Sequence, residues 1–220
     1  MHYKPILIVA GEPNSVFLEI FFKSIKKLKN KSPLILIASY ELVKLQMEKL
    51  KFRKKINILN EQSFLNTKID NKQINLINVN YKSTKAFENI SSRSNRYITN
   101  CFNTAFRLIK RHNFDKLING PISKKNYLSQ KYLGITEYIS KKFNIRKSAM
   151  LIYNNKLSVC PITTHLPLKF VTKNINAKLI IEKVKLLNKF YKNKLDIKPK
   201  IAVLGLNPHC ESIDKYNEDE

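Results

Sequence analysis

Two histidines occupy matching places in the C-terminal half of the chain, and a neutral imidazole is a common ligand of divalent metals. His165 follows an apolar run at 157–164, and His209 follows another at 201–204. The stretch between them, 175–195, has helical periodicity, so the segment predicts a strand-crossover-strand unit. A right-handed crossover brings the carboxyl ends of both strands to one edge of the sheet. We therefore predict that His165 and His209 form half of a divalent metal site.

The spacing of the two histidines also fits two unrelated loop residues. A catalytic metal site usually has three protein ligands and an open position, and no other residue of this chain stands out as the third. We expect that the third ligand is missing or that another subunit supplies it. The three cysteines lie far apart without C-x-x-C spacing. This pattern argues against a disulfide framework and an all-thiolate zinc site, and it favours a reducing cytoplasm.

Apolar runs alternate with amphipathic stretches along the whole chain. Strands are predicted at 5–10, 33–38, 55–59, 74–79, 115–119 and 200–204, and a hairpin at 150–162. Helices are predicted at 15–29, 41–50, 95–112 and 175–195. The inner face of the first helix is predicted to comprise Val16, Ile20, Phe21 and Ile25. This alternation predicts a layered α/β fold with a mostly parallel sheet.

Three of the four glycines, Gly11, Gly120 and Gly205, directly follow predicted strands. Ligands of open α/β sheets bind outside the carboxyl ends of the strands, and glycine lets the backbone approach a ligand. We favour a ligand-binding role for these turns over an ordinary strand-to-loop turn.

The net charge of +25 invites a nucleic-acid interpretation, but 35 of the 41 basic residues are lysines scattered through every segment. Nucleic-acid surfaces favour clustered arginine, so we expect solvated lysine faces and no nucleic-acid partner. The charge would still attract an anionic small substrate. No apolar run reaches the length of about 18 residues that a membrane span needs, and the N-terminus lacks the features of a signal peptide.

Five runs occur in the order found in one enzyme family. They are Gly11-Glu12-Pro13, residues 119–124, Gly134-Ile135-Thr136-Glu137, residues 163–168 and residues 205–211. With these runs the chain resembles the 4-hydroxythreonine-4-phosphate dehydrogenase family of vitamin B6 biosynthesis. The resemblance implies a three-layer α/β/α fold similar to the isocitrate and isopropylmalate dehydrogenases, with a first domain at 1–130 and a second at 131–220. It also implies a homodimer with the active site at the subunit interface.

The resemblance further implies a divalent metal (Zn, Mg or Co) held by three histidines shared between subunits. His165 and His209 fall on two of those positions, and Thr136 falls on a substrate-binding position. The implied reaction uses NAD or NADP to oxidise and decarboxylate 4-phosphooxy-L-threonine to 3-amino-2-oxopropyl phosphate. No G-x-G-x-x-G run occurs, so a Rossmann-type cofactor site is unsupported, and the cofactor-binding and catalytic residues stay unassigned. Lys124 is a candidate for the substrate phosphate, although we favour the simpler interpretation of an exposed lysine.

Two departures from the family pattern leave alternatives open. Ile135 stands where the family has a histidine, which alters the pocket and leaves room for another four-carbon acid phosphate, of the threonate type, as the substrate. Family members are also much longer, and their additional part carries the third metal histidine. We expect the sequence to be incomplete at its C-terminal end, the alternative being an inactive remnant of the family.

Overall fold

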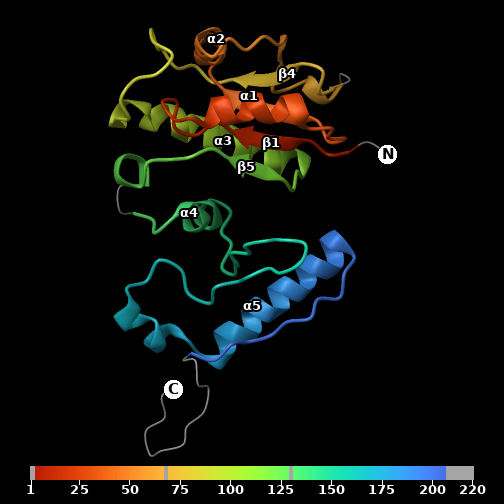
Figure 1. The fold of residues 1–220 in the computed structure, drawn as a ribbon, viewed down its shortest axis with the longest axis vertical. Helices are drawn as coiled ribbons and strands as arrows, with labels where there is room; N and C mark the ends of the chain where they lie inside the picture. The colour runs from red at the N-terminus through yellow and green to blue at the C-terminus, as the bar shows by residue number, and fades with distance from the viewer. Residues whose placement is uncertain (1–2, 67–68, 129–130, 207–220) are drawn as a thin grey trace, which may run out of the picture. The chain divides into compact units, whose positions relative to one another are not determined.

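The computed structural model describes residues 3–66, 69–128 and 131–206 (Figure 1). It divides into two compact units, Met1–Lys131 and Tyr132–Glu220. The first unit contains the β-sheet, whereas the described part of the second contains two α-helices, short 3-10 and π-helical turns and long stretches of irregular backbone.

A five-stranded parallel sheet forms the centre of the first unit, with the strand order β3-β4-β2-β1-β5. The strands are β1 (Ile6–Val9), β2 (Leu34–Ala38), β3 (Ile56–Ile58), β4 (Ile74–Asn78) and β5 (Leu117–Asn119). The central strands are continuous apolar runs because helices cover both of their faces. The predicted α/β fold with a mostly parallel sheet is confirmed.

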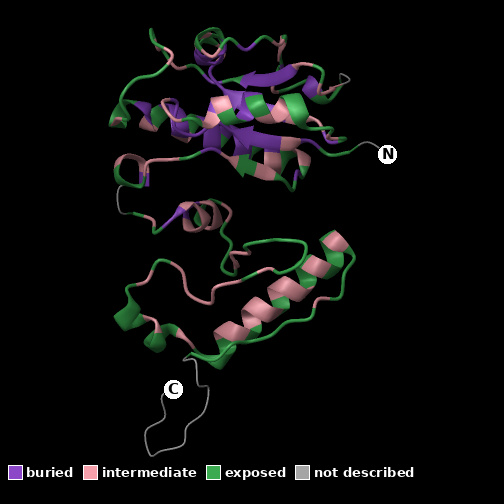
Figure 2. Ribbon diagram, viewed as in Figure 1, coloured by how far each residue is buried: buried purple, intermediate pink, exposed green. Residues whose placement is uncertain are grey.

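Helices cover the sheet on its two faces, which makes the first unit a three-layer structure. Helices α1 (Phe17–Lys27) and α2 (Tyr40–Lys49) pack on one face, in a cluster that includes Ile8, Leu36 and Leu76. Helix α3 (Asn95–His112) contacts β1 and β2 but contributes no residue to that cluster, so it covers the opposite face. Most of the buried residues of the first unit lie in the strands and in the helices that pack on them (Figure 2).

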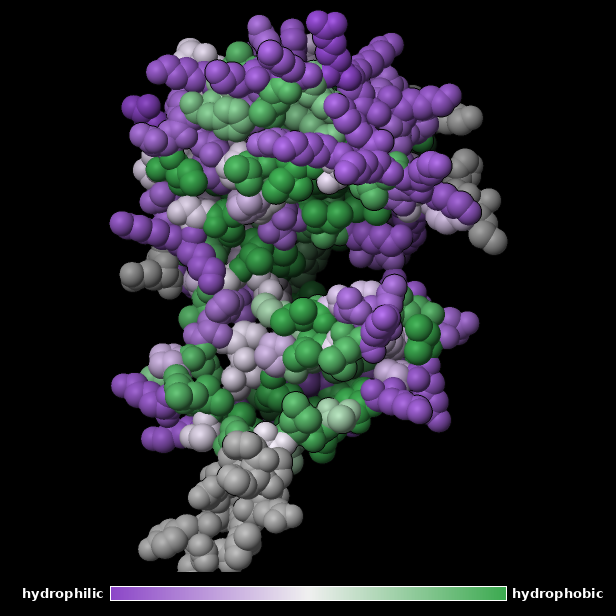
Figure 3. Space-filling model, in the orientation of Figure 1, coloured by the Kyte–Doolittle hydropathy of each residue, from purple (hydrophilic) through white to green (hydrophobic). Residues whose placement is uncertain are grey.

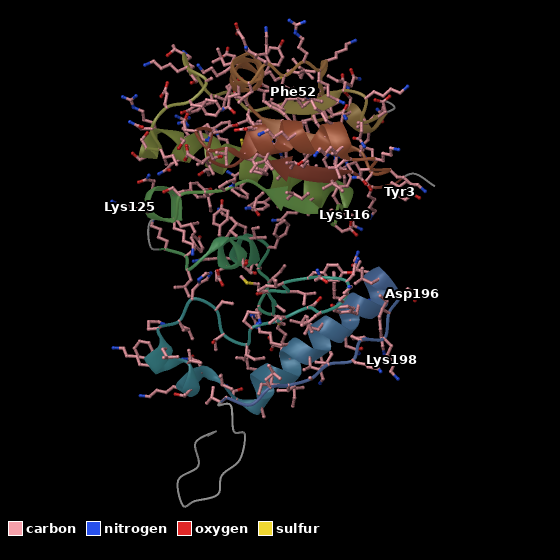
Figure 4. All side chains as sticks on the ribbon, in the orientation of Figure 1. Tyr3, Phe52, Lys116, Lys125, Asp196 and Lys198 are labelled. Atoms are coloured by element: carbon pink, nitrogen blue, oxygen red, sulfur yellow. The ribbon has the colours of Figure 1, made fainter. Side chains whose placement is uncertain are left out.

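The predicted inner face of α1 is wrong in part. Val16 and Ile20 are 59% and 53% exposed, whereas Leu18, Phe21 and Phe22 are buried. Apolar residues occur around most of this helix, so periodicity alone left its rotation undecided. Phe22 decides the rotation by stacking on Phe52, labelled in Figure 4, with ring centroids 4.6 Å apart.

The turns after β1 and β5 lie directly against each other. The Glu12 N–H donates a 2.8 Å hydrogen bond to the Pro121 carbonyl oxygen. Gly11 has φ +74°, and a Cβ placed there would lie 2.4 Å from the same oxygen. A Cβ on Gly120 would lie 2.1 Å from the Ala10 carbonyl oxygen. These glycines therefore serve the close packing of two strand ends, which is a structural role that the sequence analysis ranked second.

The second unit contains α4 (Ile135–Lys142) and α5 (Ala177–Phe190), which continues into a π-helical turn at Tyr191–Leu195. The sequence analysis did not predict α4. The predicted hairpin reduces to one antiparallel bridge between Ile152 and Val159, and the strand predicted at 200–204 does not form. The predicted strand-crossover-strand unit around α5 is therefore wrong.

The strands predicted in the second unit do not form because a strand needs a neighbouring strand that pairs with its backbone hydrogen-bonding groups. Leu157 and Leu204 are 76% and 88% exposed, and no described residue of α5 is buried. Green apolar side chains accordingly lie on the surface of this unit in Figure 3. Among the described residues, no helix combines the length and apolar character needed to cross a membrane.

Candidate functional site

Two separate runs of the sequence meet at the beginning of α4. The Nε2 and Cδ2 atoms of His165 lie 3.1 and 3.4 Å from the position that a Cβ would occupy on Gly134. The Oε2 atom of Glu137 lies 3.0 Å from the same position. Gly134 has extended backbone that any residue adopts, so what its missing side chain provides is space. The imidazole and the carboxylate can approach one point because residue 134 is a glycine.

The loop that carries His165 has an unusual backbone and a specific tether. His165 has φ +58°, in the left-handed region that residues other than glycine rarely adopt. The preceding residue, Thr164, donates a hydrogen bond from Oγ1 to Oε1 of Glu137 at 3.3 Å. Strained backbone persists where the surrounding contacts hold it in place, and it is concentrated at functional sites. The tether to Glu137 is one such contact.

The second carboxylate oxygen of Glu137 lacks a partner. Oε2 is buried from solvent and accepts no hydrogen bond in the structure. Leaving a buried acceptor unpaired costs about 1–3 kcal/mol, and more when the group is charged. In metal centres a carboxylate commonly supports a histidine ligand, and both kinds of side chain lie close to Gly134 here. The residues present at this place therefore fit a divalent metal centre.

The other predicted site residues lie as follows. Thr136 is in the first turn of α4, partly exposed, between Ile135 and Glu137. The structure thus places Thr136 at the same helix end as the His165 contact. His209 lies outside the described residues, so its pairing with His165 stays a prediction. Among the described residues, no three His, Cys, Asp or Glu side chains gather closely enough to hold a metal ion.

Glu137 is the residue of this site to which the sequence analysis assigned no role. Glu137 belongs to the family run Gly134–Glu137. Its position one helical turn after Gly134 could have indicated that the two residues lie close together, but a helix at 135–142 was not predicted. Lys124, the candidate for the substrate phosphate, is an exposed residue of the π-helical turn Lys124–Leu128 in the first unit.

Residues 29–218 match the sequence profile of the family described as the pyridoxal phosphate biosynthetic protein PdxA. The chain belongs to the PdxA family. The resemblance inferred from the five sequence runs is therefore confirmed.

Curated PdxA relatives cover almost all of this chain. The 4-hydroxythreonine-4-phosphate dehydrogenase of Sulfurihydrogenibium sp. is 32% identical over 219 residues, which are 98% of this chain and 66% of the relative. The enzyme of the same name from Aquifex aeolicus is 28% identical over 225 residues, with coverages of 99% and 67%. This chain thus spans about two thirds of the length of these PdxA relatives.

Solved structures show the same fold. A chain from Salmonella typhimurium superposes with a TM-score of 0.84 at 21% identity, covering 99% of this chain and 68% of its own. The 4-hydroxythreonine-4-phosphate dehydrogenase from Klebsiella pneumoniae gives a TM-score of 0.80 at 21% identity, with coverages of 94% and 65%. The predicted fold class is that of PdxA structures.

Proposed function

We propose that this chain functions as a 4-hydroxythreonine-4-phosphate dehydrogenase, which oxidises and decarboxylates 4-phosphooxy-L-threonine with NAD or NADP in pyridoxal phosphate biosynthesis. The names of its PdxA relatives support the reaction. The observation that supports particular residues is at Gly134, where the His165 ring and an unpaired buried oxygen of Glu137 both lie close to the position of the missing side chain.

His165 and His209 would hold the divalent metal, with a third histidine from a partner subunit. Neutral imidazole ligands leave the positive charge of the ion undiminished. A divalent ion supplies Lewis-acid chemistry, which eases proton loss from an alcohol and stabilises negative charge on oxygen, and the nicotinamide cofactor accepts the hydride. The donors at the site suit either Zn or Co, and Mg is a further candidate.

Thr136 would orient the substrate. Its hydroxyl lies in the first turn of α4, whose N-cap residue, Gly134, provides no side chain to cap the helix. The first backbone N–H groups of a helix have no partner within it, and they favour negatively charged groups. The beginning of α4 therefore offers backbone donors to the substrate, and Thr136 would fix the orientation of the substrate by a hydrogen bond.

The assembly that we propose is a cytoplasmic homodimer with the active site at the subunit interface. We also propose that the chain comprises two domains, at 1–130 and 131–220, and that it binds no nucleic acid. The resemblance to the PdxA family is what supports the sharing of metal ligands between subunits.

The test measures NADH or NADPH formation at 340 nm with the purified full-length protein, 4-phosphooxy-L-threonine and Zn, Co or Mg ions. Wild-type protein should turn over the substrate only with a divalent ion, and His165→Ala should abolish this activity. Lys173→Ala, an exposed change in the same unit, is the control and should retain it. Metal-independent turnover by the His165 variant would contradict the proposal, as would a clear preference for threonate 4-phosphate, which Ile135 makes worth assaying.

A further inference from the structure

Glu137 uses its two carboxylate oxygens differently. Oε1 accepts the hydrogen bond from Thr164, the residue directly before His165. Oε2 is buried and has no hydrogen-bond partner. Buried polar atoms nearly always have a partner in native proteins, so a donor for Oε2 is expected among the groups that share its surroundings.

The imidazole of His165 shares those surroundings. Its Nε2–Cδ2 edge faces Gly134, at 3.1 and 3.4 Å from the Cβ position, and Oε2 of Glu137 reaches the same position at 3.0 Å. Nδ1 is the ring nitrogen that does not belong to this edge. A neutral imidazole has one N–H donor and one unprotonated nitrogen. An acceptor that binds Nε2–H therefore leaves Nδ1 unprotonated.

We propose that Glu137 is the positioning residue of His165, whose Nε2–H it binds through Oε2, leaving Nδ1 unprotonated and available to a divalent cation. The structure holds no hydrogen bond or ion pair between the two side chains, so the exposed imidazole would rotate beside Gly134 to bring Nε2–H to Oε2. Histidines that bind metals commonly donate their other ring N–H to a carboxylate, which fixes the tautomer and the ring orientation. The metal-binding part of this inference rests on the proposed function, whereas the tautomer does not.

The left-handed backbone of His165 agrees with this arrangement. A residue at φ +58° needs contacts that hold it, and Glu137 would supply two of them, one to Thr164 and one to the imidazole. Gly134 is also needed for this arrangement, because a side chain at position 134 would occupy the space next to the His165 ring and the Glu137 carboxylate.

The first experiment determines the tautomer of His165 without metal, substrate or cofactor. Long-range ¹⁵N–¹H spectra of the ¹⁵N-histidine-labelled chain are recorded at pH 8, and the His165 signals are assigned by their absence in His165→Gln. We expect the Nε2–H tautomer in the wild type and a mixture of both tautomers in Glu137→Ala. Glu182→Ala is the matched control, since Glu182 pairs with Lys147 in the same unit, and it should leave the spectrum unchanged.

An Nδ1–H tautomer in the wild type would overturn the proposal, and so would an unchanged His165 spectrum in Glu137→Ala. Gly134→Ala provides a second variant that keeps the carboxylate. Its added methyl group should separate the ring from Oε2 and give the same mixture of tautomers, whereas a wild-type spectrum would count against the shared space. These readouts do not depend on whether the chain is a dehydrogenase.

The second experiment measures Zn²⁺ affinity by calorimetry on the same proteins. Loss of a carboxylate that supports a histidine ligand typically weakens metal binding about 10- to 100-fold, and we expect this loss in Glu137→Ala but not in Glu182→Ala. Equal affinities in the wild type and Glu137→Ala would overturn the role of Glu137. Wild-type protein that binds no Zn²⁺ but shows the Nε2–H tautomer would contradict the proposed function and still support the pairing with Glu137.

Discussion

Ser94 donates a 2.8 Å hydrogen bond from its Oγ atom to Oε2 of Glu12, which joins the beginning of α3 to the turn after β1. Glu12 is only 3% exposed, and its other carboxylate oxygen accepts a longer hydrogen bond, of 3.4 Å, from the Asn14 N–H. The hydroxyl of Ser94 therefore replaces part of the hydration that this carboxylate loses when the chain folds.

Ser94→Ala should lower the free energy of unfolding by about 1–3 kcal/mol, because it leaves a buried carboxylate oxygen without its shortest hydrogen bond. Urea denaturation followed by circular dichroism measures the loss. Ser92→Ala, at an exposed neighbouring position, is the control and should change stability by less than about 0.5 kcal/mol. Equal stabilities of the two variants would show that the Ser94 hydrogen bond has no net effect.

Gly120→Ala should destabilise the first unit by about 1–3 kcal/mol or more. Its new Cβ would lie 2.1 Å from the Ala10 carbonyl oxygen and 2.8 Å from the Phe17 ring, so backbone must move. The thermal midpoint by circular dichroism measures the effect, with Gly205→Ala, at an exposed position, as the control. A Gly120 variant as stable as this control would contradict the close packing of the two turns.

Cys101 should resist alkylation as long as the protein stays folded. It is 0% exposed, and burial raises the pKa of its thiol to about 12, which removes the reactive thiolate. Cys160 is partly exposed, and burial raises its pKa as well. Iodoacetamide at pH 8 should therefore label Cys160 first and Cys101 only in denaturant, as read from peptide masses. Labelling of both at one rate in the folded protein would contradict this order.

Glu61 should make stability depend on pH at the acidic end. Arg107 donates hydrogen bonds to both of its carboxylate oxygens, one from Nη2 at 2.8 Å, and this hydrogen bonding lowers the pKa of Glu61 below 4.5. A carboxyl group whose pKa is lower in the folded state stabilises the fold above its unfolded pKa, and this contribution is lost as the pH falls through the folded pKa. Because Arg107 is largely exposed, the contribution is at most about 1 kcal/mol.

Glu61→Gln should therefore be less stable than the wild type at pH 7, and the difference should shrink as the pH falls to 3. Urea denaturation at both pH values measures it. Glu48→Gln, at an exposed position of α2, should differ little from the wild type at either pH. A Glu61 difference of the same size at pH 3 would argue that the pair acts through packing and not through charge.

The first unit could be predicted closely because its local signals agree with its tertiary contacts. The helix predicted at 95–112 is α3, Asn95–His112, and Asn113 ends it in the left-handed conformation that asparagine tolerates at such a position. The rotation of α1 could not be predicted, because Ile20 and Phe22 are both apolar and only the stacking of Phe22 on Phe52 distinguishes them. The run at 200–204 looks like a strand, yet pairing needs a neighbour that the sequence pattern does not reveal.

The sequence by itself determined the parallel α/β sheet and the family, and it predicted a site in the runs that contain Thr136 and His165. The hydrophobic periodicity of a segment and the residues of a motif are local properties of the sequence, so both can be recognised without knowing the fold. Only the tertiary structure decided that His165 meets Gly134 and Glu137, since residues nearly thirty positions apart come together through the path of the chain. The absence of a side chain at Gly134 matters because the side chains of His165 and Glu137 lie close to the space it would fill. The sequence does not show which side chains share a space in the folded protein.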